Sequence, residues 1–198
     1  RPNKLLVSFF PSCMDEYALI QNKEDWPRRG WGEDRLAVLD VYSCLKSIGI
    51  PFNLVVRLHP NLLTKHVDER FEANTLSSLK EVKLLSESSQ MCSYHLVSNS
   101  DIVLTTGSTI GIESADLGVK SVLLSTATYE DLGATLNVYN MSKLKETLRY
   151  LSVEINRQKE NSSVKSQHLK FGIANSIGSA KRKYFNVVRH DLSYFVGD

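Results

Sequence analysis

The chain has 198 residues, of which 42% are apolar and 23% are charged, and its formal net charge is +2. This composition fits one globular domain, and it excludes a collagen, a disulfide-dense miniprotein and a disordered tail. The small net charge gives no reason to expect a nucleic-acid partner. No apolar run reaches the roughly 18 residues that a membrane-spanning helix needs.

The cysteines and the first residue indicate the setting of the protein. Cys13, Cys44 and Cys92 are odd in number and form no CxxC pair, which favours a reducing compartment and buried thiols. The first residue is Arg and no signal peptide follows it, so we expect a piece of a longer protein.

Short apolar runs alternate with amphipathic stretches along the chain. The apolar runs predict strands at 5–10, 53–58, 82–85, 101–105 and 121–125. Helical spacing predicts helices at 33–47, 66–79, 91–98, 109–117 and 142–151. In the first of these helices the apolar face is expected to hold Leu36, Leu39, Val41, Tyr42 and Leu45. Because the strands are continuously apolar, we predict an α/β fold with a parallel sheet covered by helices on both faces.

The last part of the chain differs in composition. Residues 154–167 are polar and are predicted to link a domain at 1–153 to a basic helical segment at 168–198. Residues 165–198 carry six Lys or Arg against two Asp, a net charge of +4. This segment could contact anionic lipid or a partner domain, or it could simply face solvent.

Three polar clusters follow three of the predicted strands. They lie at 11–17, 57–61 and 105–113. In an open parallel sheet, ligands bind beyond the carboxyl ends of the strands. We therefore expect the three clusters to form one site.

The third cluster connects a strand directly to a helix. Gly107 would let the backbone approach a ligand, and the first helical N–H groups with the hydroxyls of Ser108 and Thr109 would suit a phosphate. Glu113, one turn later, is placed to accept hydrogen bonds from sugar hydroxyls. The alternative is that Ser108 or Thr109 only caps the helix.

The other clusters offer weaker candidates. Arg57 and His59 share one face of an extended segment and could clamp a phosphate, although a lone His is often structural. Asp15 and Glu16 could act as acid and base, or begin a helix. Tyr94 could stack on a base or belong to the core. No metal site is expected, because the histidines lack ligand spacing.

Several motifs together resemble a known family. They are Phe9-Phe10-Pro11-Ser12 with Asp15-Glu16, Arg57-Leu58-His59-Pro60-Asn61, Ser93-Tyr94, and the stretches 101–113, 117–122 and 129–133. Over residues 4–150 the chain is similar to the carboxy-terminal half of bacterial surface or capsule polysaccharide glycosyltransferases of the two-Rossmann-domain type, GT-B. The resemblance implies a single Rossmann-like, doubly wound domain, one half of that architecture.

The resemblance also implies a function: a metal-independent transferase domain that binds a nucleotide-sugar donor as substrate, needs no cofactor, and favours a cytidine nucleotide. An absent amino-terminal domain would bind a glycan or lipid-linked acceptor, and the setting would be cytoplasmic, with possible contact at the inner face of the plasma membrane. The implied catalytic residues are Asp15, Glu16 and His59. The implied donor-binding residues are Ser12, Arg57, His59, Tyr94, Gly107, Ser108, Thr109 and Glu113.

Two other readings stay open. A nucleotide-sugar 2-epimerase or a polyol-phosphate transferase would share the architecture. A non-catalytic nucleotide-sensing or docking module would use the same domain without turnover, with the basic tail bound to a membrane or a partner.

Overall fold

The structure is a computed structural model that describes residues 4–12, 29–31, 34–58, 76, 78–86 and 88–162. Asp15, Glu16, His59 and the basic segment 168–198 lie outside these residues, as does most of the helix predicted at 66–79. The predictions made for them stay predictions.

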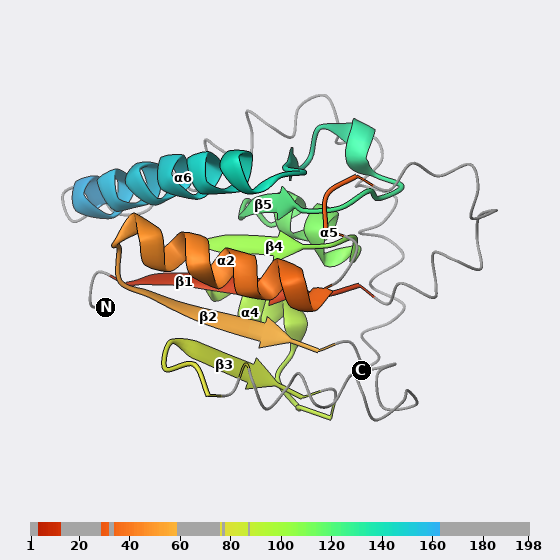
Figure 1. The fold of residues 1–198 in the computed structure, drawn as a ribbon, viewed down its shortest axis with the longest axis horizontal. Helices are drawn as coiled ribbons and strands as arrows, with labels where there is room; N and C mark the ends of the chain where they lie inside the picture. The colour runs from red at the N-terminus through yellow and green to blue at the C-terminus, as the bar shows by residue number, and fades with distance from the viewer. Residues whose placement is uncertain are drawn as a thin grey trace.

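The core is a six-stranded parallel sheet with the order β3-β2-β1-β4-β5-β6 (Figure 1). Its strands are β1 (Leu5–Phe10), β2 (Phe52–Arg57), β3 (Val82–Leu85), β4 (Ile102–Thr105), β5 (Lys120–Leu123) and β6 (Leu136–Asn137). The chain builds outward from β1 through β2 to β3, then crosses back to place β4 on the other side of β1. The order therefore reverses between β1 and β4, where the register aligns Phe10 with Thr105.

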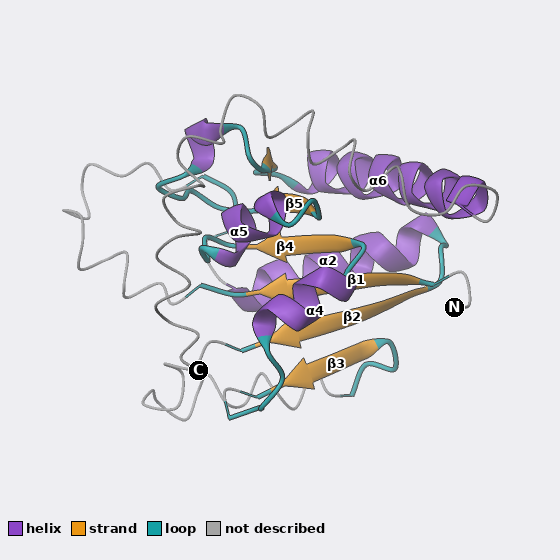
Figure 2. Cartoon of the chain, turned by 180° about the vertical axis from the view of Figure 1, so that it is seen from behind, coloured by secondary structure: helices purple, strands orange, loops and turns teal. Residues whose placement is uncertain are grey.

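Helices cover both faces of the sheet (Figure 2). One face carries α2 (Asp34–Ile48) and α6 (Met141–Ser162), which pack on each other. The opposite face carries α4 (Ser93–Asn99) and α5 (Ile110–Asp116), and a short 3-10 helix, η2 (Glu130–Leu132), follows β5. The predicted doubly wound, Rossmann-like α/β fold is confirmed.

The central strands β1 and β4 are mostly apolar because both of their faces are buried. Leu5, Val7 and Phe9 of β1 belong to the core on the side of α2 and α6. Phe10 of the same strand and Val103 of β4 belong to a second core, which includes Leu96 of α4. The continuous apolar pattern in the sequence is the consequence of these two cores.

Two expectations about the helices are corrected. Leu36 was expected on the buried face of α2, but it is 45% exposed, and Ala37, Val38 and Cys44 are buried instead. The helix predicted to end at residue 151 continues to Ser162, so residues 154–162 of the predicted linker are helical. The reason is that apolar spacing persists: Ile155 is buried one turn after Leu151.

The remaining differences are small. The structure adds β6 and η2, which have two and three residues and leave too short a pattern to recognise. No helix among the described residues is long and apolar enough to cross a bilayer.

Candidate functional site

The ends of β1 and β4 meet where the strand order reverses. The backbone N–H of Ser12, just after β1, donates to Oγ1 of Thr106, just after β4, at 3.1 Å. The two hydroxyl oxygens, Ser12 Oγ and Thr106 Oγ1, lie 3.3 Å apart, and both residues are buried. A crevice beyond the carboxyl ends of the strands at such a reversal is the general ligand site of open α/β sheets. Two of the predicted polar clusters are thus brought together.

Thr105 organises the turn between β4 and α5. Its Oγ1 accepts from the N–H of Gly107 at 3.1 Å and from the N–H of Ser108 at 2.8 Å. Gly107 has a φ of 147°, a conformation that favours glycine. Since both N–H groups already donate to Thr105, a phosphate at this turn would have to share or displace these bonds.

The hydroxyls of the turn do not form a strong helix cap. Thr109 occupies the cap position of α5, but its side chain makes no capping hydrogen bond. Oγ of Ser108 accepts from the N–H of Ile110 at a long 3.4 Å. The side chain of Thr109 therefore does not cap the helix, whereas Ser108 makes one long bond of that kind. Capping by Ser108 and phosphate binding by Ser108 and Thr109 both stay predictions.

Tyr129 holds the beginning of α5 in place. Its hydroxyl donates to the carbonyl oxygen of Ser108 at 2.6 Å. Gly111 allows this approach, because a Cβ at that position would lie 2.7 Å from the Tyr129 hydroxyl and 2.7 Å from Cγ2 of Thr105. Thr105 and Tyr129 lie in stretches that the sequence marks, but their positioning roles depend on packing between separate elements and leave no local pattern.

Tyr94 and Glu113 form a pair at the same edge of the sheet. Each lies in the first turn of its helix, and α4 packs against α5. A hydrogen bond with the Glu113 carboxylate is the main cause that raises the pKa of Tyr94 to about 12, with burial second. Tyr94 is 43% exposed, so it is not the core residue that one reading proposed. The structure makes it a donor to Glu113.

Arg57, at the end of β2, has a structural contact that the sequence did not indicate. Its Nη1 donates to the carbonyl oxygen of Ser86 at 2.9 Å, and its Nη2 donates to that of Ser89 at 3.0 Å. These bonds tie the end of β2 to the loop after β3. His59, its predicted partner in a phosphate clamp, lies outside the described residues.

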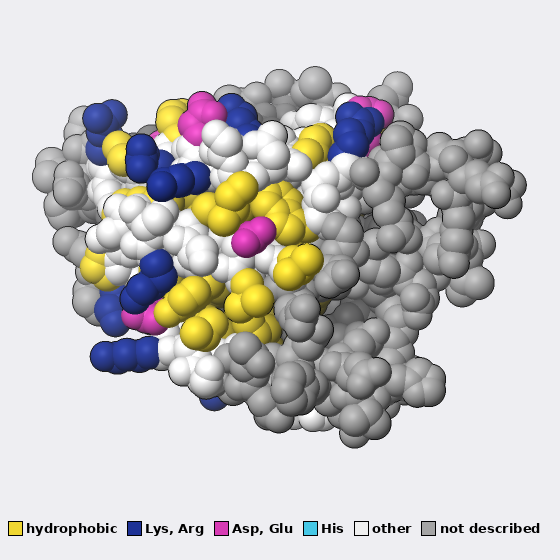
Figure 3. Space-filling model, in the orientation of Figure 1, with side chains coloured by type: hydrophobic (Ala, Val, Ile, Leu, Met, Phe, Trp, Pro, Cys, Tyr) yellow, Lys and Arg dark blue, Asp and Glu magenta, His cyan; other side chains and the backbone are white. Residues whose placement is uncertain are grey.

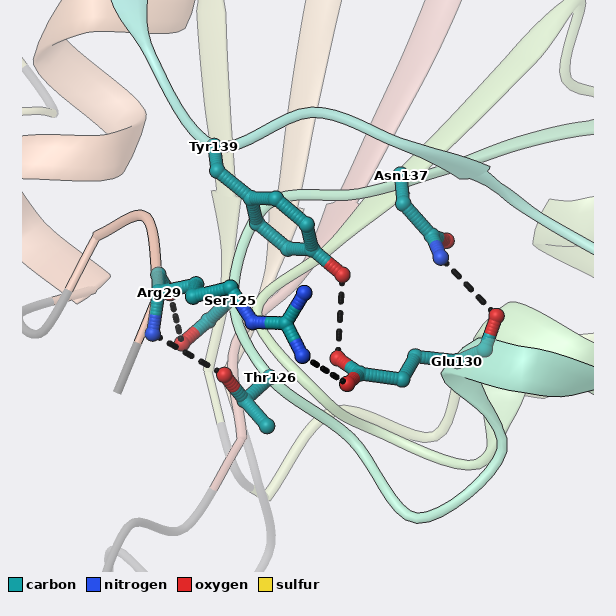
Figure 4. A network of polar contacts seen from close by, with 6 residues as sticks. All are labelled: Arg29, Ser125, Thr126, Glu130, Asn137 and Tyr139. Carbon is teal, nitrogen blue, oxygen red and sulfur yellow. Dashed lines mark hydrogen bonds and ion pairs between the residues drawn. The ribbon is translucent and has the colours of Figure 1, made fainter. Parts of the chain in front are cut away.

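A second polar cluster follows β5 (Figure 4). Nη2 of Arg29 pairs with Oε1 of Glu130 at 3.1 Å, and the hydroxyl of Tyr139 donates to Oε2 at 2.9 Å. The Arg29 guanidinium also lies 5.5 Å from the centre of the Tyr139 ring. Asn137, Ser125 and Thr126 complete the cluster through hydrogen bonds between their side chains and backbone atoms of Glu130 and Arg29. The sequence analysis did not single out this cluster.

Within the described part of the chain, no group of three or more His, Cys, Asp or Glu side chains could hold a metal ion.

Comparisons with known proteins define the fold. No protein-family model matches the chain, and no curated protein matches it. Among solved structures, UDP-GlcNAc 2-epimerase from Methanocaldococcus jannaschii, in complex with UDP-GlcNAc and UDP, superposes with a TM-score of 0.53 at 18% identity, covering 76% of this chain and 39% of that one. The structure of S. aureus MnaA with UDP superposes with a TM-score of 0.52 at 15% identity. The superposition covers 79% of this chain and 39% of that one.

A Kdo-transferase structure is also similar: Thermosulfurimonas dismutans KpsC, a β-Kdo 2,4-transferase, gives a TM-score of 0.45 at 15% identity, with 77% of this chain and 44% of that one covered. The chain spans about two fifths of the length of the two UDP-bound structures, 39% of each. The described domain thus has a Rossmann-like α/β fold that it shares with part of these longer proteins, and the fold that the resemblance implied is confirmed.

Proposed function

We propose that this domain binds the nucleotide-sugar donor of a glycosyltransferase that acts in bacterial surface or capsular polysaccharide synthesis. The observation that carries the proposal is the contact between Ser12 and Thr106 at the point where the strand order reverses. The Tyr94–Glu113 pair lies on the neighbouring first turns of α4 and α5, at the same edge.

Glu113 is the acceptor for the ribose hydroxyls in this proposal. Among the described residues it takes part in no ion pair. The hydroxyl of Tyr94 is hydrogen-bonded to that carboxylate. A carboxylate is a strong acceptor for further hydroxyl hydrogen bonds.

Phosphate binding is assigned to the turn of Ser108 and Thr109, and to Arg57 and His59 if their side chains turn toward the donor. Positive groups of this kind can stabilise a nucleotide leaving group without a metal ion. Asp15, Glu16 and His59 stay the candidate catalytic residues. The acceptor, a glycan or a lipid-linked sugar, would be bound by another domain.

A second candidate is a nucleotide-sugar 2-epimerase. The specific observation is that the two solved structures with a TM-score above 0.5 reported above contain UDP, one of them together with UDP-GlcNAc. An epimerase domain would select uridine nucleotides, whereas the glycosyltransferase reading favours a cytidine nucleotide. The base therefore separates the two candidates.

The experiment is a calorimetric titration of the full chain with CMP, CDP, UDP, GDP and ADP. Selective binding of one base supports a nucleotide-sugar site, and the identity of the base decides between the two candidates. The same titration is repeated with Glu113→Gln, which we expect to weaken binding about tenfold, the effect of one lost charge-assisted hydrogen bond. Asp116→Asn, the same change in charge at an exposed position of α5, is the control.

Two outcomes would count against the proposal. If none of the five nucleotides binds, this chain does not carry a donor site. If Glu113→Gln and Asp116→Asn bind with wild-type affinity, the site lies elsewhere on the domain.

A further inference from the structure

Three positive side chains form a row on the outer surface of α6. Lys145, Arg149 and Arg157 are exposed and, with Val153, they recur every four residues. Residues spaced by four lie one above the other on a helix surface, so these cations share one ridge. Like charges at this spacing repel each other, and a helix surface shaped only for stability would alternate them with acidic residues.

The acidic residues of α6 with described partners do not neutralise the row. Glu146 pairs with Lys143 at 3.1 Å, and Glu154 pairs with Lys120 of β5 at 3.4 Å. Among the described residues, Lys145, Arg149 and Arg157 take part in no ion pair. The described acidic side chains therefore leave the three cations of the row unpaired.

Apolar side chains lie among the cations. Tyr150 is 64% exposed and Val153 is 41% exposed, on the side of α6 that faces away from the core. The opposite side packs into the core through Leu144, Leu148 and Leu151. We call the surface made by Lys145, Arg149, Tyr150, Val153 and Arg157 the basic face of α6.

The basic face lies on the outside of the molecule. In Figure 1, α6 runs along one margin of the fold and β3 lies at the opposite margin. Lys and Arg side chains gather over α6 with hydrophobic side chains beside them, at the upper left of Figure 3. A helix of 22 residues is about 33 Å long, so a flat partner can touch the whole row at once.

We propose that the basic face of α6 binds an anionic membrane surface. The complementary partner of an unneutralised row of cations is a negatively charged one, and an exposed tyrosine between cations suits the interface between lipid headgroups and acyl chains. The contact is peripheral, since the buried side of α6 stays in the core.

The tail of the chain, residues 165–198, could also cover the basic face of α6, but the charge of the tail argues against this. Residues 165–198 carry a net charge of +4, the same sign as the basic face. The tail would be repelled by the row and attracted to the same anionic surface. Face and tail would then act together, as clustered Lys and Arg residues do at such membranes.

The test is co-sedimentation of the full chain with two kinds of vesicle. One kind is phosphatidylcholine alone, and in the other about one third of the lipid is phosphatidylglycerol, which gives an anionic surface. We expect binding to the anionic vesicles only, and less binding as salt rises. In the variant K145A/R149A/R157A the affinity should fall roughly 100-fold, at about fivefold per cation.

The matched control is K4A/K80A/K83A, which removes the same amount of charge from exposed lysines outside α6. This control should bind nearly as well as the wild type, and circular dichroism checks that both variants fold. The proposal is overturned if the wild type does not bind anionic vesicles, if the K145A/R149A/R157A variant binds as well as the wild type, or if both variants lose affinity equally. Binding of an RNA oligonucleotide in place of vesicles would also overturn it.

Discussion

Two tyrosine–glutamate pairs lie at the carboxyl edge of this sheet, and their surroundings differ. In each pair the tyrosine hydroxyl is hydrogen-bonded to the glutamate carboxylate, Tyr94 to Glu113 and Tyr139 to Glu130. The pKa of both tyrosines is raised to about 12. For Tyr94 the hydrogen bond is the main cause, whereas for Tyr139 burial is the main cause.

The two glutamates differ in the partners of their carboxylates. Glu130 has a side chain that is only 11% exposed, and it pairs with Arg29, so its charge is balanced inside the protein. Its backbone carbonyl oxygen also accepts from Asn137. Glu113 has no such cation among the described residues. A carboxylate that is paired with a cation and hydrogen-bonded inside the protein joins segments of the chain. A carboxylate near the surface without such a cation is available to a ligand.

The largest expected effect on stability comes from disturbing the backbone next to Arg29, where Gly30 lies against Leu124. Gly30 has a φ of +77°, and a Cβ there would lie 2.0 Å from the carbonyl oxygen of Leu124. Gly30→Ala should lower the free energy of unfolding by about 3 kcal/mol or more, because backbone strain adds to a steric clash. Urea denaturation of the full chain measures it.

Gly118→Ala is the control for this first prediction. Gly118 has a φ of +75°, but a Cβ there would meet nothing within 4 Å. Its cost should therefore be the strain alone, about 1–2 kcal/mol. If Gly30→Ala and Gly118→Ala lower the free energy of unfolding equally, the close contact of residue 30 with Leu124 adds nothing to the strain. That contact then does not hold Arg29 in place.

The next effect concerns the balanced pair itself. Glu130→Ala removes the acceptor of both Arg29 and Tyr139, and it should lower the free energy of unfolding by about 2 kcal/mol, the usual cost of losing hydrogen bonds to a partly buried charge. Chemical denaturation checks this value. Glu146→Ala, which breaks an exposed pair with Lys143, should cost less than about 0.5 kcal/mol. If Glu130→Ala costs as little as Glu146→Ala, the structural role of Glu130 is contradicted.

A substitution in the pair of Tyr94 and Glu113 should change ligand affinity more than it changes the free energy of unfolding. Tyr94→Phe removes the hydroxyl that orients Glu113. We expect about fivefold weaker nucleotide binding, equivalent to about 1 kcal/mol for a hydrogen bond, with little change in the unfolding midpoint. Titration of the nucleotide that binds the wild type measures the effect. Unchanged affinity in Tyr94→Phe would separate Tyr94 from the ligand site.

The fold was predictable where the signal is local. The strand predicted at 5–10 matches β1, because a continuous apolar run marks a strand buried on both faces. The strand predicted at 82–85 matches β3, an edge strand with no fully buried residue. The end of α6 was not predicted because its last two turns are mostly polar in sequence, and among the side chains described there Ile155 is the one buried in the core.

The site was only partly predictable, because its contacts join residues far apart in the sequence. Tyr94 and Glu113 were each singled out, but their hydrogen bond depends on how α4 packs on α5. Arg57 was expected to face a phosphate, yet its guanidinium binds the carbonyl oxygens of Ser86 and Ser89. Arg29 and Glu130 are separated by 101 positions, and no local pattern relates them.

The smallest expected effect is a dependence of stability on alkaline pH. The pKa of Tyr139 in the folded protein is about 12, above its ordinary value of 10.0. Above about pH 10 the unfolded chain loses this phenol proton while the folded protein keeps it. The stabilisation is therefore complete below about pH 10 and is lost as the pH rises toward about 12. Urea midpoints at about pH 9 and about pH 11 should fall less in Tyr139→Phe than in the wild type. Tyr150→Phe, at a tyrosine that is 64% exposed, should behave as the wild type does. If Tyr139→Phe loses as much stability as the wild type over this range, the half-buried Tyr139 does not hold its phenol proton beside Glu130.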